Sequence, residues 1–217
     1  MFGVGSSIKH SIIICCSVLL MLSALPAFAT YTGLLIIPIA ETVGADQYTV
    51  DLVYNGVVGG TNIITNFIDT EIGMGNRFEA GVDFGLDKDT EPAIIGNAKY
   101  LLYSKYNQQA LAVGVYGWGQ NSSSFPYIVG LKNLGVFRLH LGAARSSGEN
   151  QWFTGADRTF NKWTLMADYT SGSGNFSSAG FKYQFNDRFG IMAGTVFTNN
   201  SPNSNFTLQL VYGASYR

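Results

Sequence analysis

Apolar and polar residues alternate without interruption in residues 78–86, and this pattern limits the folds that are open to the chain. In an extended strand, Phe78 and Val82 would lie on one face, with Glu79 and Asp83 on the other. In a soluble β-sandwich the apolar face would point into a core. In a membrane β-barrel it would face lipid, and the two acids would line the interior.

The same alternation recurs along the chain in runs of roughly ten residues, the length that a tilted strand needs to cross a bilayer. The run at 151–160 has the weakest pattern, the run at 111–119 is apolar on both faces, and no stretch has a helical period. The pattern predicts about twelve antiparallel strands, at residues 47–55, 64–74, 78–86, 97–102, 111–119, 125–132, 137–144, 151–160, 163–170, 179–185, 189–197 and 206–213.

The connections between these runs fall into two alternating classes. Short connections are expected at 75–77, 104–108, 133–135, 161–162 and 186–187, and longer polar loops at 56–61, 87–91, 120–124, 146–150, 171–175 and 199–205. Short turns at one end and longer loops at the other are typical of outer-membrane barrels. A soluble sandwich gives no reason for this sorting, so the connections favour a membrane barrel.

The low content of charged residues also favours a surface that faces lipid. Charged residues make up 12% of the chain, whereas a soluble domain usually carries about 25%. The formal net charge is −1 and no basic run is present, so nucleic acid is not an expected partner.

Residues 1–29 have the features of a secretory signal peptide. Lys9 precedes an apolar run at 11–25, and an Ala-x-Ala cleavage pattern ends at Ala29. Cleavage there would leave a mature chain that begins at Thr30. Both cysteines lie within the removed segment, which excludes a disulfide framework and a thiol nucleophile.

A lead segment, residues 30–45, separates this signal peptide from the barrel that we predict at residues 46–217. Residues 33–37 are apolar but do not alternate, and Pro38 then interrupts them. We expect the lead segment either to form an edge strand or to enter the barrel lumen.

Aromatic residues are expected to form girdles on the lipid face near the strand ends, as they do at both interfaces of membrane barrels. The candidate pairs are Tyr48 and Tyr54, Phe78 and Phe84, Phe125 and Tyr127, and Phe181 and Phe185.

The polar faces of the strands predict the lining of the lumen. In a barrel of intermediate width, charged side chains on these faces either pair with one another and fill the lumen, or line a narrow conduit or binding cavity for a polar solute. The lining is mixed in sign, so it lacks the basic character that acidic oligosaccharides would require. The candidate lumen-lining residues are Asp51, Asp69, Glu71, Glu79, Asp83, Lys99, Lys132, Arg138, His140, Asp168 and Lys182.

Signals for catalysis and metal binding are weak. His140 would be the sole histidine after signal cleavage, and no cluster has metal-ligand spacing. We therefore expect no enzyme activity, no metal and no cofactor. Two alternatives stay open: a lipid-active barrel enzyme that uses His140 beside a serine, and a secreted soluble β-protein.

Residues 32–41, TGLLIIPIAE, resemble the start of mature outer-membrane barrels that are associated with exopolysaccharide operons, the YjbH-like family. The stretch NRFEAGV at 76–82, followed by GNAKY at 96–100 and ALAVG at 110–114, is similar to the repeated hairpins of that family. The resemblance implies a minimal single-barrel member with a link to cell-surface polysaccharide.

The sequence thus predicts an all-β protein of the bacterial outer membrane, a closed antiparallel transmembrane β-barrel after a cleaved signal peptide. We expect a structural or narrow-channel role. The expected partners are outer-membrane lipid, the barrel-assembly and periplasmic chaperone machinery, and a small polar solute or polysaccharide.

Overall fold

The described residues of the computed structural model are 33–58, 63–86, 94–119, 124–199 and 204–216. Among them no helix is long and apolar enough to cross a membrane. The predicted signal peptide lies outside the described residues.

Twelve strands are present in the described residues: β1 (Gln47–Val57), β2 (Ile63–Met74), β3 (Phe78–Gly85), β4 (Ile94–Lys105), β5 (Gln109–Gly119), β6 (Phe125–Asn133), β7 (Arg138–Ser146), β8 (Glu149–Phe160), β9 (Trp163–Thr170), β10 (Phe176–Gln184), β11 (Phe189–Thr198) and β12 (Ser204–Ser215).

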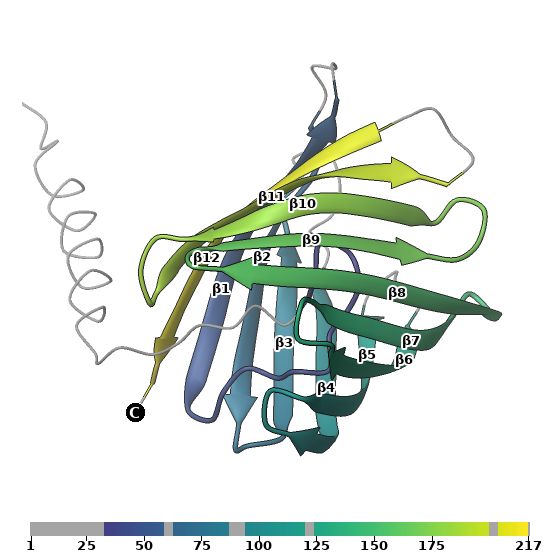
Figure 1. Cartoon of the computed structure of the whole chain (residues 1–217). Coiled ribbons are helices and arrows are strands. Elements are labelled where there is room, and N and C mark those ends of the chain that lie inside the picture. Colours follow the sequence, from purple (N-terminus) through teal and green to yellow (C-terminus); the bar gives the residue numbers. More distant parts are fainter. Residues whose placement is uncertain (1–32, 59–62, 87–93, 120–123, 200–203, 217) are drawn as a thin grey trace, which may run out of the picture.

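The strands form one closed antiparallel barrel (Figure 1). Each strand pairs with its neighbours in the chain, and β1 pairs with β12 from Gln47 and Ser215 to Val57 and Asn205. Closure leaves no sheet edge with unpaired backbone groups, which is the condition for a β-structure to cross a membrane. The prediction of a closed antiparallel barrel of about twelve strands is therefore confirmed.

The outer face of the barrel is apolar. Leu52, Leu141 and Leu165 are each about half exposed in the middle of their strands, at 48%, 59% and 51%. The adjacent residue in each strand points inward, and Asp51 and His140, which precede Leu52 and Leu141, are fully buried. This arrangement is the reverse of a soluble β-sandwich, and it fits a surface that contacts lipid.

Aromatic rings gather on the outer face at both ends of the barrel. At one end, Phe189 packs against Tyr212 with ring centroids 4.8 Å apart, and Trp163 packs against Tyr183 at 4.6 Å. At the other end, Trp152 and Tyr169 lie 5.2 Å apart. These rings form the girdles that membrane barrels carry at their interfaces.

The connections follow the predicted sorting with one exception. The turn end of the barrel carries the connections at 75–77, 106–108, 134–137, 161–162 and 185–188, and the loop end carries the others. At the loop end, the predicted longer loop at 146–150 is in fact a two-residue turn of Ser147 and Gly148. Both have positive φ, at 49° and 86°, which suits the right-handed twist of a two-residue hairpin.

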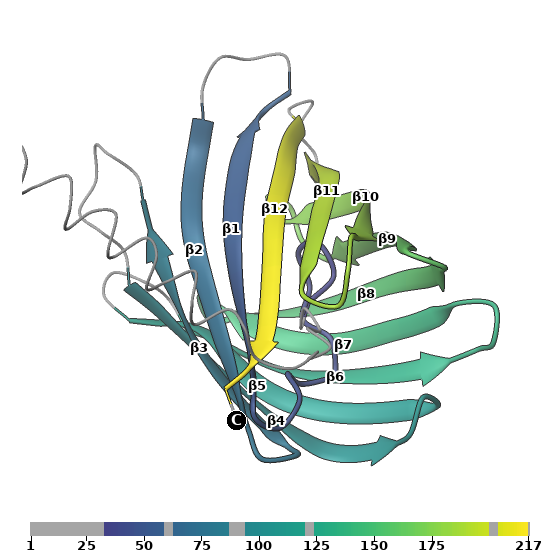
Figure 2. The ribbon, with the colours of Figure 1, turned by 90° about the vertical axis from the view of Figure 1, so that its left-hand side faces the viewer.

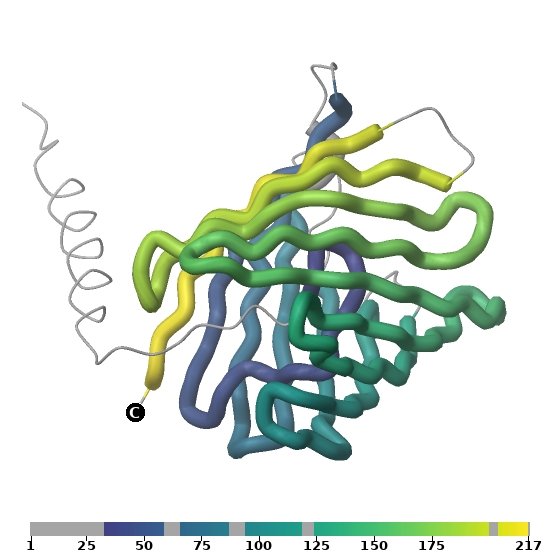
Figure 3. The backbone as a smooth tube through the Cα atoms, in the orientation of Figure 1, coloured from purple at the N-terminus to yellow at the C-terminus, as the bar shows by residue number. Residues whose placement is uncertain are grey.

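The apolar core lies inside the barrel rather than between layers. The described part of the lead segment, residues 33–45, runs through the interior, where it is drawn in dark purple in Figures 2 and 3. Its side chains pack against inward residues of the strands such as Phe153 and Met192, both of which are fully buried. Of the two expectations for this segment, entry into the lumen matches the observed path.

The prediction for β6 was wrong by one residue, so that it exchanged the inward and outward faces of this strand. Leu131 pairs with His140 and both are buried, whereas Lys132 pairs with the exposed Leu139 and is itself exposed. Lys132 therefore lies on the outer face at the turn end and does not line the lumen. By the same parity, Phe125 and Tyr127 point inward and do not belong to the lipid-facing girdles.

The error has a physical reason. Both faces of β6 are apolar, so alternation alone gives no phase to this strand. The inward face needs apolar residues because it packs against the apolar lead segment, and Val129 in this face is fully buried.

Candidate functional site

Three polar contacts tie the lead segment to the barrel wall. The backbone N–H of Val43 donates to Glu79 Oε2 at 2.6 Å, and the backbone N–H of Ile36 donates to Asp168 Oδ2 at 3.2 Å. Glu41 of the segment accepts from Arg138 Nη1 at 2.8 and 2.9 Å. The strands thus satisfy polar groups of a segment that has almost no regular structure of its own.

Apolar side chains of the lead segment rest on glycines of the barrel wall. A Cβ at Gly155 would lie 2.5 Å from Leu34 Cδ1 and 2.7 Å from Ile37 Cδ1. A Cβ at Gly194 would lie 2.6 Å from Leu35 Cδ1. The wall is therefore hollowed where the lead segment packs, and larger residues at these positions would displace it.

Arg138 joins the lead segment to a buried acid on β8. Its Nε donates to both carboxylate oxygens of Asp157 at 3.0 and 3.1 Å, while Nη2 lies 2.9 Å from Oδ2. Asp157 Oδ1 also lies 2.7 Å from His140 Nε2. One fully buried carboxylate therefore holds two basic side chains of β7 in place, and one of them reaches Glu41.

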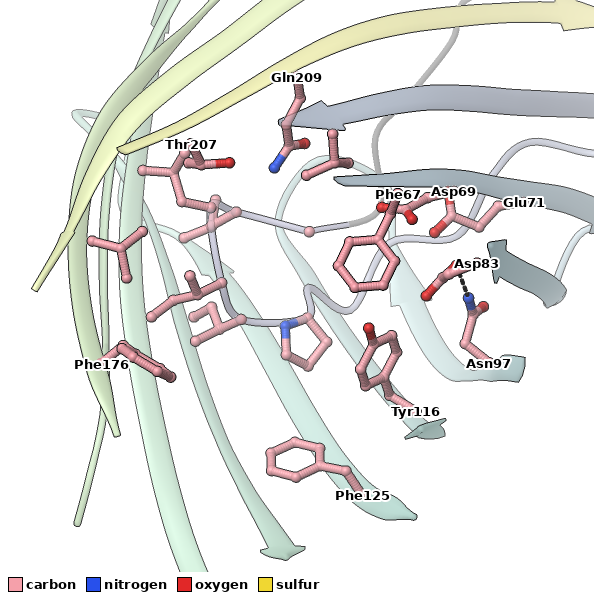
Figure 4. A pocket seen from close by; sticks show the side chains of 18 of the residues that line it. Phe67, Asp69, Glu71, Asp83, Asn97, Tyr116, Phe125, Phe176, Thr207 and Gln209 are labelled. Carbon is pink, nitrogen blue, oxygen red and sulfur yellow. Dashed lines mark hydrogen bonds between the residues drawn. The ribbon is translucent and has the colours of Figure 1, made fainter. Parts of the chain in front are cut away.

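A loop-side cavity of about 420 Å³ lies between the lead segment and strands β1 to β6 and β10 to β12 (Figure 4). One part of its wall is acidic, with Asp69, Glu71 and Asp83 on β2 and β3. Another part is aromatic, with Phe67, Tyr116, Phe125, Tyr127 and Phe176. Asn97 donates to Asp83 Oδ1 at 3.2 Å, and Thr49 donates to Glu71 at 2.8 Å.

Acids of three neighbouring strands stand opposite one another beside this wall. Asp51 of β1 pairs in register with Asp69 of β2, and Asp69 pairs with Asp83 of β3. Side chains that are directly opposite in antiparallel strands are about 5 Å apart, and like charges in such pairs destabilise the sheet. This row therefore lowers stability when all three acids are ionised.

A turn-side cavity of about 500 Å³ lies at the opposite end of the interior. It is mixed in charge, with Arg138, Lys162 and Lys182 beside Glu41 and Asp157. Gly33 and Leu34 line both cavities, so the lead segment lies between them.

The structure places the predicted lumen residues in four groups. Asp69, Glu71, Glu79, Asp83 and Lys99 line the loop-side cavity, and Arg138 and Lys182 line the turn-side cavity. Asp51, His140 and Asp168 are buried in the barrel interior and line neither cavity. Lys132 is on the outer face.

Sequence reasoning missed three residues that organise the lumen. Asp157 lies in the run with the weakest alternation, so its inward direction had no support in the pattern. Glu41 lies in the lead segment, which has no periodicity. Tyr116 directly precedes a bulge of β5, at which Trp118 pairs with Gly96 and Tyr116 with Asn97. Gly117 between them has a φ of 80°. A glycine inside a strand pattern can mark such a bulge, and Gly117 was the one feature of the sequence that indicated it.

His140 has the surroundings of a structural residue. Its side chain is fully buried and Nε2 contacts Asp157, while Nδ1 has no hydrogen-bond partner among the described residues. Neither ring nitrogen therefore contacts a serine hydroxyl in this part of the chain. Within the described residues, no group of three His, Cys, Asp or Glu side chains is arranged to hold a metal ion.

Comparison with solved structures shows the type of fold. The KdgM porin, solved in complex with disordered oligogalacturonate, is 13% identical, with a TM-score of 0.59 over 76% of this chain and 98% of that one. A second structure of the KdgM porin is 14% identical, with the same TM-score and coverage. This chain has the fold of an outer-membrane β-barrel. The fold and the apolar outer face together assign the protein to the bacterial outer membrane.

Sequence comparisons add no family. No protein-family model matches the chain, and no curated protein matches it in sequence. The narrower resemblance to the YjbH-like family therefore stays a prediction.

Proposed function

We propose that the protein is a narrow outer-membrane channel for small polar solutes, and that its lead segment closes the lumen. The observation that carries this proposal is the position of residues 33–45 inside the barrel, between the two cavities. Barrels of eight strands are filled by their own side chains, and barrels of 16–18 strands leave an open aqueous channel. A barrel of twelve strands falls between these sizes, so one chain segment is enough to block it.

The contacts of the lead segment favour the closed state. Leu34, Leu35, Ile37, Ile39 and Val43 are each at most 5% exposed. Burial of such a side chain contributes about 1.5–3 kcal/mol. We therefore expect the wild-type channel to open briefly and rarely.

The solute is unlike the one solved with the KdgM porin. Oligogalacturonate carries many carboxylates, and the acidic wall of the loop-side cavity would repel them. We propose neutral or cationic polar solutes instead. A link to cell-surface polysaccharide rests on the sequence resemblance alone.

We also propose that the protein is not an enzyme. His140 is buried in the barrel interior and contacts Asp157, so it has access neither to lipid nor to a nucleophile among the described residues. The KdgM porins of similar fold support a channel rather than a hydrolase.

Single-channel recording in planar bilayers tests the proposal. Wild-type protein should show brief openings, and a variant that lacks residues 33–43 should show openings that are longer and larger. The double variant Glu41→Gln with Asp168→Asn keeps the chain length and should show an intermediate effect. Heat-modifiable migration on a gel establishes that each protein is folded. Folded protein that gives no channel events in any of the three forms would overturn the proposal.

A further inference from the structure

The loop-side cavity has the chemistry of a cation site. We propose that it binds a small organic amine and that it makes the lumen prefer cations to anions. The part of this inference that concerns selectivity rests on the proposed channel function, whereas the part that concerns binding does not.

The cavity wall has an excess of acids that no base on the wall balances. Lys99 is the one basic side chain of the described lining, and it pairs with Glu79 at 3.2 Å. The charge of Lys99 also acts on Glu71, so one base of the described lining faces four acids, Asp69, Glu71, Glu79 and Asp83. The row of Asp51, Asp69 and Asp83 across three strands concentrates this negative charge at one place.

Buried acceptors beside this wall lack donors. Gln209 lines the cavity and is 3% exposed, and its Oε1 has no hydrogen-bond partner among the described residues. Figure 4 shows its amide directed into the cavity. Both carboxylate oxygens of the fully buried Asp51 also lack hydrogen-bond partners in this part of the chain. A buried hydrogen-bond acceptor without a donor destabilises the folded protein by about 1–3 kcal/mol. The site is therefore suited to a ligand that brings hydrogen-bond donors.

An ammonium group brings what the cavity lacks. It carries three donors and no acceptor, and it carries the positive charge that the acids require. Tyr116 and Phe67 lie next to the acids in Figure 4, and aromatic faces attract cations and cover apolar carbon chains. The described acids do not converge as metal ligands do, so the cavity is better suited to an organic amine than to a metal ion.

Binding is tested by calorimetry on the full chain folded in detergent, with putrescine as the probe. Its matched control is 1,4-butanediol, which has a similar length and no charge. Wild-type protein should bind putrescine and not the diol. The double variant Asp69→Asn with Asp83→Asn should bind putrescine at least tenfold more weakly, and the exposed variant Glu149→Gln should bind like wild type. Absence of putrescine binding, or equal binding by the double variant, would overturn the proposal.

Selectivity is tested by the reversal potential of the full chain in a KCl gradient. Wild-type openings should be cation-selective, and the Asp69→Asn with Asp83→Asn variant should lose most of this preference. Openings that prefer anions, or that do not change in the variant, would contradict the inference. If no openings occur at all, the channel function fails and the calorimetry alone decides the amine site.

Discussion

Neutralisation of Asp157 should destabilise the barrel more than neutralisation of any exposed acid. Asp157 has a fully buried side chain and contacts both Arg138 and His140. Removal of one partner from a buried ion pair costs about 3–5 kcal/mol. Arg138 is 32% exposed and keeps Glu41 as a partner, so solvent and the second acid reduce this cost. We expect Asp157→Asn to lower the free energy of unfolding by about 2–3 kcal/mol.

The assay is reversible denaturant unfolding in lipid vesicles, followed by tryptophan fluorescence. Glu149→Gln is the matched control because it neutralises an exposed acid of the same strand, β8, and it should change stability by less than about 0.5 kcal/mol. Glu41→Gln breaks a pair in which both side chains are about one-third exposed, and it should cost less than about 1 kcal/mol. If Asp157→Asn proves as stable as Glu149→Gln, the reasoning about the buried network is refuted.

Three further predictions concern side chains on the outer and inner faces of the barrel strands. Leu141→Arg puts a charge on the lipid face in the middle of β7 and should lower the free energy of unfolding in vesicles by about 2–4 kcal/mol. An unchanged free energy of unfolding would contradict a lipid-facing position for Leu141. Gly155→Leu should displace Leu34 and lengthen channel openings in bilayer recordings, whereas Gly130→Leu on the outer face should leave them unchanged. Lys99→Gln should cost about 3 kcal/mol in the same unfolding assay because it leaves Glu79 buried without its cation. Lys132→Gln on the outer face should change stability by less than about 0.5 kcal/mol, and equal effects of the two lysine variants would be evidence against the assigned phase of β6.

Much of the fold could be predicted because each strand has one face in lipid and one in the interior. In β9, for example, Leu165 and Tyr169 alternate with Met166 and Asp168, and the structure gives these pairs opposite faces. The two environments differ so strongly that period-two alternation fixes the direction of the side chains. The closed barrel and its strand number followed from this repeat.

The details of the lumen could not be predicted for a different reason. An apolar segment fills part of the interior, so strands that touch it need apolar residues on both faces. Val129 and Leu131 of β6 contact this interior core, and this removes the signal that would have placed Lys132 outside. The partners of Arg138 lie 97 residues before it and 19 residues after it in the chain, and the sequence carries no pattern that links them.

A reversible disulfide between the lead segment and the barrel wall tests the central claim most directly. The double variant Ile37→Cys with Gly155→Cys would bring two thiols close together, because a Cβ at Gly155 would lie 2.7 Å from Ile37 Cδ1. Single-channel recording should show no openings from the oxidised protein, and addition of a reductant should restore them. Equal conductance before and after reduction would contradict the claim that the lead segment closes the lumen.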